Sequence, residues 1–320
     1  MPVAGWLGAR HTPRLLTLTS LAFMVTLPLP GFVTSLPALA AALLLMGACA
    51  GSMDVCMNAR ASRIEQGWGR AIMSSFHAAF SLGGLLGTLI VATAVGLGLG
   101  VLAGLRLTSG LLAAVTAAHF LLDPKPDLAA AGDSPAIAWP SRAVAGIGLL
   151  CLLAFLCEGA VADWSGVFLR QVAAYSAPAS AAGYAAFSAA MVAARLAGDA
   201  VVRRFGPVRT LQAGGLLAAS GMALGVAVPA IAPVGFALVG LGGANMAPIL
   251  FSAAGRAGSA ASAGVAAVAT LGYGGMLLGP ALVGALAEAT SLRIALLLLV
   301  AAMATIALAA GRAIGLSSPP

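Results

Sequence analysis

The sequence predicts an all-α polytopic membrane protein, and its composition carries that prediction. Of its 320 residues, 61% are hydrophobic and only 8% are charged, and 41 are glycine. A soluble domain carries about 25% charged residues, so this chain has too little polar surface to cover itself in water. Abundant glycine is typical of helices that pack closely within lipid.

Apolar stretches long enough to cross a bilayer recur along the whole chain. A membrane helix needs about 20 apolar residues. On that criterion we expect about ten spans, near residues 15–36, 37–59, 72–96, 98–122, 143–169, 177–202, 208–230, 231–254, 260–287 and 291–311. Turns rich in proline and glycine, such as Pro28–Gly31, separate several of them.

One long polar connection, residues 123–142, divides the predicted spans into four and six. Its prolines and charged residues are typical of a flexible cytoplasmic linker. We therefore expect an incomplete N-terminal helical bundle over residues 1–122 and a C-terminal six-helix bundle over residues 143–320. Transporters built from two similar halves carry equal numbers of spans. The uneven division predicts that two N-terminal helices are missing from this sequence, through a misplaced start or a real truncation.

The placement of Lys and Arg predicts the orientation in the membrane. With both termini in the cytoplasm, the outer side holds three of these residues, Arg106, Arg170 and Arg293. The inner side holds twelve, which are Arg10, Arg14, Arg60, Arg63, Arg70, Lys125, Arg142, Arg203, Arg204, Arg209, Arg256 and Arg312. This bias follows the positive-inside rule of a bacterial inner membrane. Because the basic residues are spread singly, the formal charge of +7 does not indicate nucleic-acid binding.

Two polar residues inside an otherwise apolar predicted helix are the first candidates for function. Asp54 and Asn58 lie one helical turn apart and share a face. A charge at the centre of a membrane costs at least about 2.5–3.5 kcal/mol on insertion scales, so such a residue is expected to face a cavity. A buried acid beside a solute pathway takes up and releases a proton. The alternatives are that Asp54 is an acid near the cytoplasmic end, paired structurally with Arg60 or with water, and that Asn58 makes a helix-to-helix hydrogen bond.

Other isolated polar residues extend the predicted pathway. Glu158 lies at mid-depth of its span, and Asp163 lies five residues further on, at roughly 140° around the helix. His77 has the properties of a proton relay, or else of a packing histidine bonded to hydroxyls or carbonyls. Asn245 and Tyr273 lie within the second predicted bundle as candidate solute contacts.

A proline within a predicted span and a group of charged residues suggest a helix kink and a cytoplasmic charge cluster. Pro248 is expected to kink its helix and to free carbonyl groups. Four charged residues are expected to form a cytoplasmic cluster that holds one conformation closed, with Asp199 four residues from two of its potential partners. The alternative is ordinary topogenic charge. The four residues are Arg195, Asp199, Arg203 and Arg204.

These stretches together resemble the major facilitator superfamily, closest to bacterial fucose-permease-like and uncharacterised inner-membrane members. Residues 54–65 and 73–83 are similar to the fourth span, the following loop and the start of the fifth span of those proteins. Residues 158–165, 195–206 and 272–280 resemble the seventh span, the loop after the eighth span and the eleventh span. Residues 5–14 resemble a degraded copy of the loop motif between the second and third spans, with Ala9 at the usual Asp and Thr12 at the usual Gly.

The resemblance implies a secondary active transporter that works by alternating access, with an acid at the position of Asp54 in proton-linked sugar permeases. We expect a monomer in the lipid bilayer that moves a sugar or related polar metabolite with protons, without cofactor, metal or nucleic acid. Efflux of amphipathic compounds, a complete ten-span drug/metabolite carrier and a non-transporting remnant are alternatives. A membrane enzyme is disfavoured, because no catalytic or metal-binding set with suitable spacing occurs.

Overall fold

The computed structural model describes residues 16–122, 141–176, 178–257 and 261–315, and these are almost entirely helical. Within them, nine helical segments are long and apolar enough to cross a membrane, and the apolar helix Leu16–Phe32 is shorter. The predicted all-helical membrane fold is confirmed. The helices are α2 (Leu36–Trp68), α3 (Met73–Gly96), α4 (Gly100–Leu122), α5 (Arg142–Gln171), α6 (Ala182–Phe205), α7 (Pro207–Ala227), α8 (Ala232–Gly243), α9 (Met246–Ala257), α10 (Ala261–Ala289) and α11 (Leu292–Gly315).

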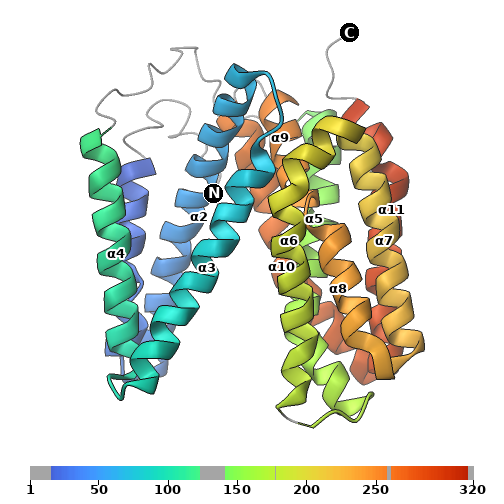
Figure 1. Ribbon diagram of the computed structural model, residues 1–320, viewed down its shortest axis with the longest axis horizontal. Coiled ribbons are helices and arrows are strands. Elements are labelled where there is room, and N and C mark those ends of the chain that lie inside the picture. The colour runs from blue at the N-terminus through green and yellow to red at the C-terminus, as the bar shows by residue number, and fades with distance from the viewer. Residues whose placement is uncertain (1–15, 123–140, 177, 258–260, 316–320) are drawn as a thin grey trace.

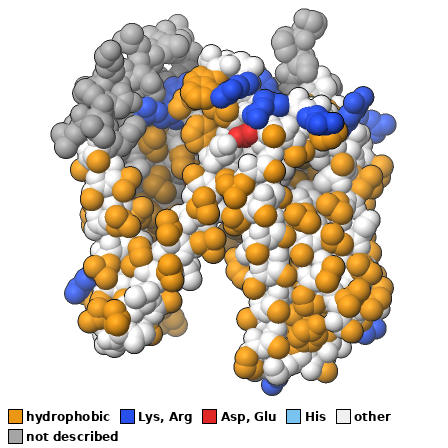
Figure 2. All heavy atoms as spheres, viewed as in Figure 1, with side chains coloured by type: hydrophobic (Ala, Val, Ile, Leu, Met, Phe, Trp, Pro, Cys, Tyr) orange, Lys and Arg blue, Asp and Glu red, His pale blue; other side chains and the backbone are white. Residues whose placement is uncertain are grey.

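The helices form two groups that meet at one end and diverge toward the other (Figure 1). The N-terminal group contains α2, α3 and α4, and the C-terminal group contains α5 to α11. Helices α2 and α3 pack against α6, α9 and α10 of the other group. We call the end where α2 passes into α3 the closed end. Figure 2 shows the space between the groups widening toward the opposite end, which we call the open end.

Arginines are distributed unequally between these two ends. The open end carries Arg106 in the second turn of α4, Arg170 in the last turn of α5 and Arg293 in the first turn of α11. The helix ends at the closed end carry a larger set, much of it visible along one edge of Figure 2, namely Arg60, Arg63, Arg70, Arg142, Arg203, Arg204, Arg209, Arg256 and Arg312. Arg10, Arg14 and Lys125 lie outside the described residues. The described part of the chain therefore has the charge asymmetry that the sequence predicts.

Glycines on α10 allow it to approach α5 closely. A Cβ atom on Gly272 would lie 2.8 Å from Cys151 Sγ, and the same face continues through Gly275 and Gly279. Gly274, on another face, has open space around its Cα. Small residues allow this kind of backbone approach between membrane helices. The contact fixes α10, and with it Tyr273, against the central helix of the C-terminal group.

The span that contains Pro248 is interrupted rather than merely kinked. Helix α8 ends at Gly243, a turn occupies Ala244 and Asn245, and α9 begins at Met246. Proline has no N–H to donate to the carbonyl four residues earlier, and its ring clashes with that carbonyl. The carbonyl in question belongs to Ala244, which is consequently free for another donor.

Helix α2 is longer than the sequence analysis expects. The prediction ended the span at residue 59, whereas the helix continues to Trp68 and ends at Gly69, which adopts a left-handed φ of 63°. Arginines after residue 59 do not stop a helix, because a helix propagates beyond the bilayer until a C-cap such as glycine ends it. The extension carries Glu65 and Gln66 to the closed end. The predicted linker, residues 123–142, and the motif at residues 5–14 lie almost wholly or wholly outside the described residues.

Candidate functional site

Asp54 lies between the two groups of helices, about 20 Å along α2 from its closed-end terminus at 1.5 Å per residue. Asn58 Nδ2 donates to Asp54 Oδ1 and to the Asp54 backbone carbonyl, at 3.0 Å in each case. The Tyr273 hydroxyl of α10 lies within hydrogen-bonding reach of the same carboxylate. The structure thus brings together three of the predicted pathway residues, two from α2 and one from the opposite group.

Glu158 lies at a similar depth on α5 and pairs with Arg195 of α6. Arg195 Nη2 is 3.9 Å from Glu158 Oε2, and the two side chains are 8% and 27% exposed. Arg195 Nε donates to the Ala244 carbonyl at 3.2 Å, and Nη1 donates to Ser81 Oγ of α3 at 2.7 Å. The carbonyl freed by Pro248 is therefore used by a buried guanidinium. Through Ser81, that guanidinium also contacts the N-terminal group.

A row of rings connects His77 with Tyr273. His77 of α3 stacks on Phe251 at 5.8 Å between ring centroids, Phe251 contacts Phe155 edge-on at 6.3 Å, and Phe155 lies 5.6 Å from Tyr273. His77 Nε2 is buried and has no hydrogen-bond partner among the described residues. Phe155 and Phe251, which the sequence analysis does not select, complete the wall between these two polar residues.

At the closed end, Glu65 joins the start of α3 to α9. Glu65 Oε2 accepts from the backbone N–H groups of Ile72 and Met73, at 3.0 and 2.9 Å. Glu65 Oε1 accepts from Ser252 Oγ and lies 3.4 Å from Arg256 Nη1. One carboxylate of the N-terminal group is therefore held by two side chains of the C-terminal group.

Asp199 of α6 makes the reciprocal connection. Its two carboxylate oxygens accept from the backbone N–H groups of Ser74 and Ser75, at 2.8 and 3.0 Å, and from Ser75 Oγ. Together, Glu65 and Asp199 accept from the N-cap and the first three residues of α3. The first N–H groups of a helix have no intrahelical partner and carry a partial positive charge, so carboxylates are stabilising there. Asp199 supplies that stabilisation from the opposite group of helices.

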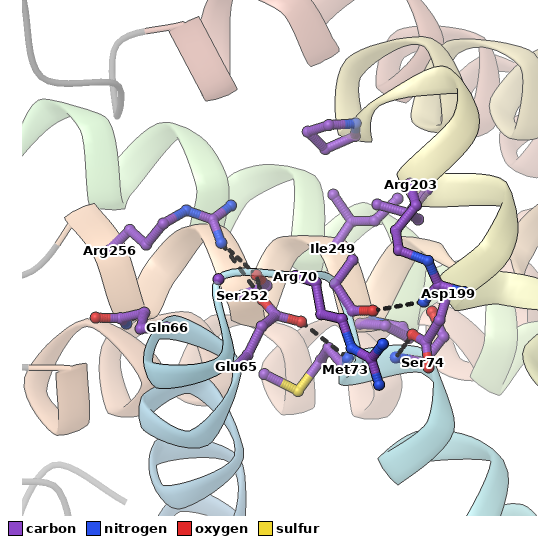
Figure 3. Close-up of a pocket in the computed structure, with 15 residues that line it drawn as sticks. Glu65, Gln66, Arg70, Met73, Ser74, Asp199, Arg203, Ile249, Ser252 and Arg256 are labelled. Carbon is purple, nitrogen blue, oxygen red and sulfur yellow. Dashed lines mark hydrogen bonds and ion pairs between the residues drawn. The ribbon is translucent and has the colours of Figure 1, made fainter.

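A pocket of about 710 Å³ lies at the closed end, between the two groups (Figure 3). Figure 3 shows Glu65 and Ser252 near its centre, with Asp199 and Ser74 along the α3–α6 side. Three arginines also line it, Arg70, Arg203 and Arg256. Arg203 Nη1 donates to the Ala71 carbonyl at 3.0 Å, which adds another bond between the groups. The pocket is therefore a vestibule whose walls are bonded to one another.

The predicted cluster of Arg195, Asp199, Arg203 and Arg204 separates into two levels in the structure. Asp199 and Arg203 belong to the closed end, whereas Arg195 lies deeper and pairs with Glu158. Arg204 lies over the ring of its neighbour Phe205, 5.5 Å from its centroid. One turn of helix separates Arg195 from Asp199 along α6, and neighbouring helices supply closer partners to each.

The remaining candidates lie at different levels. Asn245, in the break between α8 and α9, accepts from Ser74 Oγ at 2.9 Å and so belongs to the closed end. Asp163 is exposed on α5, on a different side of the helix from Glu158. Among the described residues, no group of three or more His, Cys, Asp or Glu side chains is arranged to hold a metal ion.

Sequence reasoning missed the residues that complete the closed end. Glu65, Gln66, Ser252 and Arg256 bridge α2 and α9, with Gln66 Nε2 donating to the Gly255 carbonyl at 3.2 Å. The sequence offered one signal for Glu65. The whole chain has only nine acidic residues, so each of them is a candidate for function. The serine and arginine partners of Glu65 lie more than 180 residues away, and no local pattern connects them.

Comparison with known proteins settles the family. The sequence profile of the Major Facilitator Superfamily matches residues 1–280. The chain belongs to the major facilitator superfamily. That family consists of transporters rather than enzymes, so the chain is a multi-pass membrane transporter by family.

Three relatives of this superfamily chain come from bacteria. An uncharacterised MFS-type transporter of Yersinia pestis is 38% identical over 317 residues, which is 95% of this chain and 82% of the relative. An uncharacterised transporter of Sinorhizobium fredii is 35% identical, with 90% and 77% covered. The membrane protein MosC of Rhizobium meliloti is 33% identical, with 81% and 64% covered.

Solved structures share the superfamily fold. The transporter FucP in its outward conformation has a TM-score of 0.68 at 15% identity, with 100% of this chain and 83% of that chain covered. The human organic anion transporter MFSD10 has a TM-score of 0.76 at 16% identity, with 97% and 79% covered. At such identities the likeness concerns the fold alone.

Proposed function

We propose that this transporter moves a small polar metabolite, a sugar or a related compound, across the bacterial inner membrane together with protons. The observation that carries the proposal is Asp54, an acid within a predicted membrane span and between the two groups of helices, with Asn58 and Tyr273 as its polar partners. An ionisable residue within a membrane span is functional by default, because an idle charge there is costly. One structural neighbour is the Escherichia coli fucose:proton symporter FucP.

The orientation follows from charge. Because arginines concentrate at the closed end, we assign that end, and with it both termini, to the cytoplasm. The open end then faces outward, and the described conformation is the one that accepts solute from outside. Glu65, Asp199, Arg203 and Arg204 form or border the cytoplasmic gate in this proposal. Asp54, His77, Glu158 and Tyr273 lie deeper, on the pathway.

Alternating access supplies the mechanism. Solute and proton bind from the open end, the two groups rock, and the bonds made by Glu65 and Asp199 break as the closed end opens. Those bonds join the groups through side chains and helix N–H groups. They can therefore be exchanged for water when the cytoplasmic side opens.

The test is solute-driven proton movement by the full chain in liposomes that contain a trapped pH-sensitive dye. The first probe is fucose, followed by other monosaccharides and their acid and amine derivatives. Symport predicts acidification of the lumen on addition of a transported solute outside, with entry of the radiolabelled compound. Asp54→Asn abolishes the acidification, and Glu288→Gln, at an exposed acid on α10, retains it. Labelled-solute entry without proton movement contradicts the proposal, and lumen alkalinisation indicates antiport.

A further inference from the structure

Asp54 and Glu158, the two acids within the predicted spans between the groups, differ in the charge of their partners. Glu158 faces the guanidinium of Arg195, at 3.9 Å. Asp54 accepts from the neutral Asn58 amide and lies beside the neutral Tyr273 hydroxyl. Cys151 of α5 lies near both acids. His77 is on the Arg195 side, stacked on Phe251.

Arg195 constrains what Glu158 can do. A guanidinium remains charged under all conditions in proteins. This one is 8% exposed and donates to a carbonyl and a hydroxyl, which are neutral acceptors. Glu158 is the carboxylate paired with it among the described residues. A proton on Glu158 therefore leaves a cation in the membrane interior without its counter-ion, which is strongly unfavourable.

Asp54 is under no such constraint. Its protonation removes a charge from the membrane interior and strands no other charge, since its hydrogen-bond partners are neutral. Both partners also remain able to bond the protonated form, because a carboxylic acid keeps acceptor capacity and gains a donor. The Asp54 backbone carbonyl, already bonded to Asn58, holds the amide in position in either state.

We infer that Asp54 alone carries the transported proton, while Glu158 remains ionised as the fixed counter-ion of Arg195. The inference deepens the proposed function and rests on it. With Asp54 protonated, the charges of Asp54, Glu158 and Arg195 sum to zero. His77 adds no charge in this count, because a proton there would place a second cation beside Arg195. One proton then moves in each cycle.

The assignment predicts which carboxyl group titrates, and that can be measured without a known solute. The full chain is reconstituted in liposomes, and infrared difference spectra are recorded between acidic and mildly alkaline buffer. A carboxylic acid in an apolar site gives a carbonyl stretching band that disappears on ionisation. We expect one such band in the wild type, in Glu158→Gln and in the exposed-acid control Glu288→Gln. Asp54→Asn is expected to lose it.

Two further measurements keep the test decisive if a variant fails to fold. Wild-type protein labelled with ¹³C at the aspartate side-chain carboxyl is expected to shift the band, and glutamate labelling is expected to leave it unchanged. Arg195→Gln is expected to add a second band, from Glu158, which disappears again in Arg195→Gln/Glu158→Gln. A band that follows glutamate labelling, or that survives Asp54→Asn, overturns the inference, as does a wild type without any titrating band. If the band behaves as expected and no tested sugar drives protons, only the proposed substrate fails.

Discussion

Among the described residues, the closed end contains the carboxylates of Glu65 and Asp199 and the deeper level those of Asp54 and Glu158, and the two levels differ in how fully the carboxylates are hydrogen-bonded. Glu65 and Asp199 each accept two backbone N–H groups and at least one hydroxyl, and each bond set crosses between the groups of helices. At mid-depth, Glu158 has one ion contact at 3.9 Å, and Asp54 has neutral partners. In our proposal the saturated carboxylates hold the two groups together, whereas at the deeper level Asp54 exchanges a proton and Glu158 remains the counter-ion of Arg195.

The largest effect on stability is expected when the buried ion pair of Arg195 and Glu158 is broken. Removing one partner of a buried ion pair costs about 3–5 kcal/mol, because the other charge is left uncompensated. We therefore expect Arg195→Met to lower the thermal unfolding midpoint of the purified protein strongly, and Arg195→Met/Glu158→Gln to recover most of that loss. Thermal unfolding followed by tryptophan fluorescence checks this. Glu288→Gln, an exposed acid on α10, is the matched control and is expected to change little.

A double variant no more stable than Arg195→Met would contradict the pairing. In that case Glu158 would make its main interaction elsewhere, and the mid-membrane level would lack the counter-ion that distinguishes its two acids.

The next effect concerns the closed end. Glu65→Gln removes the charge that holds two N–H groups, Ser252 and Arg256, and each poorly satisfied group costs about 1–3 kcal/mol. A net shift of about 2 kcal/mol makes the open form of this end roughly 30-fold more populated. The reporter is a cysteine at Ile249, which is 3% exposed and lines the vestibule. Faster maleimide labelling of Ile249→Cys in Glu65→Gln is expected, and an unchanged rate would argue against the tie.

The sequence predicted the fold better than the network that crosses it. Spans follow from apolar length, and the predicted ends agree with α3 to within a few residues because polar turns bound it. Asp54 and Asn58 were recognised as a pair because they are one turn apart on a single helix. The same local rule made Arg195 and Arg203 potential partners of Asp199, whereas in the structure Arg195 lies beside Glu158 and Asp199 binds the start of α3. Contacts between distant helices, such as Asp199 with the start of α3, leave no periodic trace in a single sequence.

A smaller effect is expected at the break between α8 and α9. Pro248→Ala supplies an N–H that competes with Arg195 for the Ala244 carbonyl, which weakens the anchoring of the guanidinium by about 1 kcal/mol. Hydrogen exchange over residues 243–252 is expected to slow as the helix becomes continuous. Pro280→Ala, at the proline inside α10, is the matched control and is expected to leave that segment unchanged. Unaltered exchange in Pro248→Ala would mean that the break has another cause.

The smallest effect on stability is expected from a substitution at Ser74. Ser74→Ala removes the hydrogen bond to Asn245 but leaves both backbone bonds of Asp199, so we expect a loss of about 0.5–1.5 kcal/mol. Thermal unfolding of the purified protein measures it. Ser109→Ala is the control, since the buried Ser109 hydroxyl has no hydrogen-bond partner among the described residues. Equal effects of the two substitutions would remove the bond to Asn245 from the closed-end network.

The central claim is that the carboxylates of the closed end hold the two groups together and that the deeper acids do not. The most direct test is one distance between the two groups at the closed end. Spin labels are attached at Gly67→Cys and Arg204→Cys, both exposed, and the distance is measured by double electron–electron resonance without solute. Asp199→Asn and Asp54→Asn are compared with the wild type, since the same substitution is made at each level. We predict a longer distance in Asp199→Asn and a wild-type distance in Asp54→Asn. Lengthening in Asp54→Asn with none in Asp199→Asn would contradict the claim that the closed end is held by its own carboxylates.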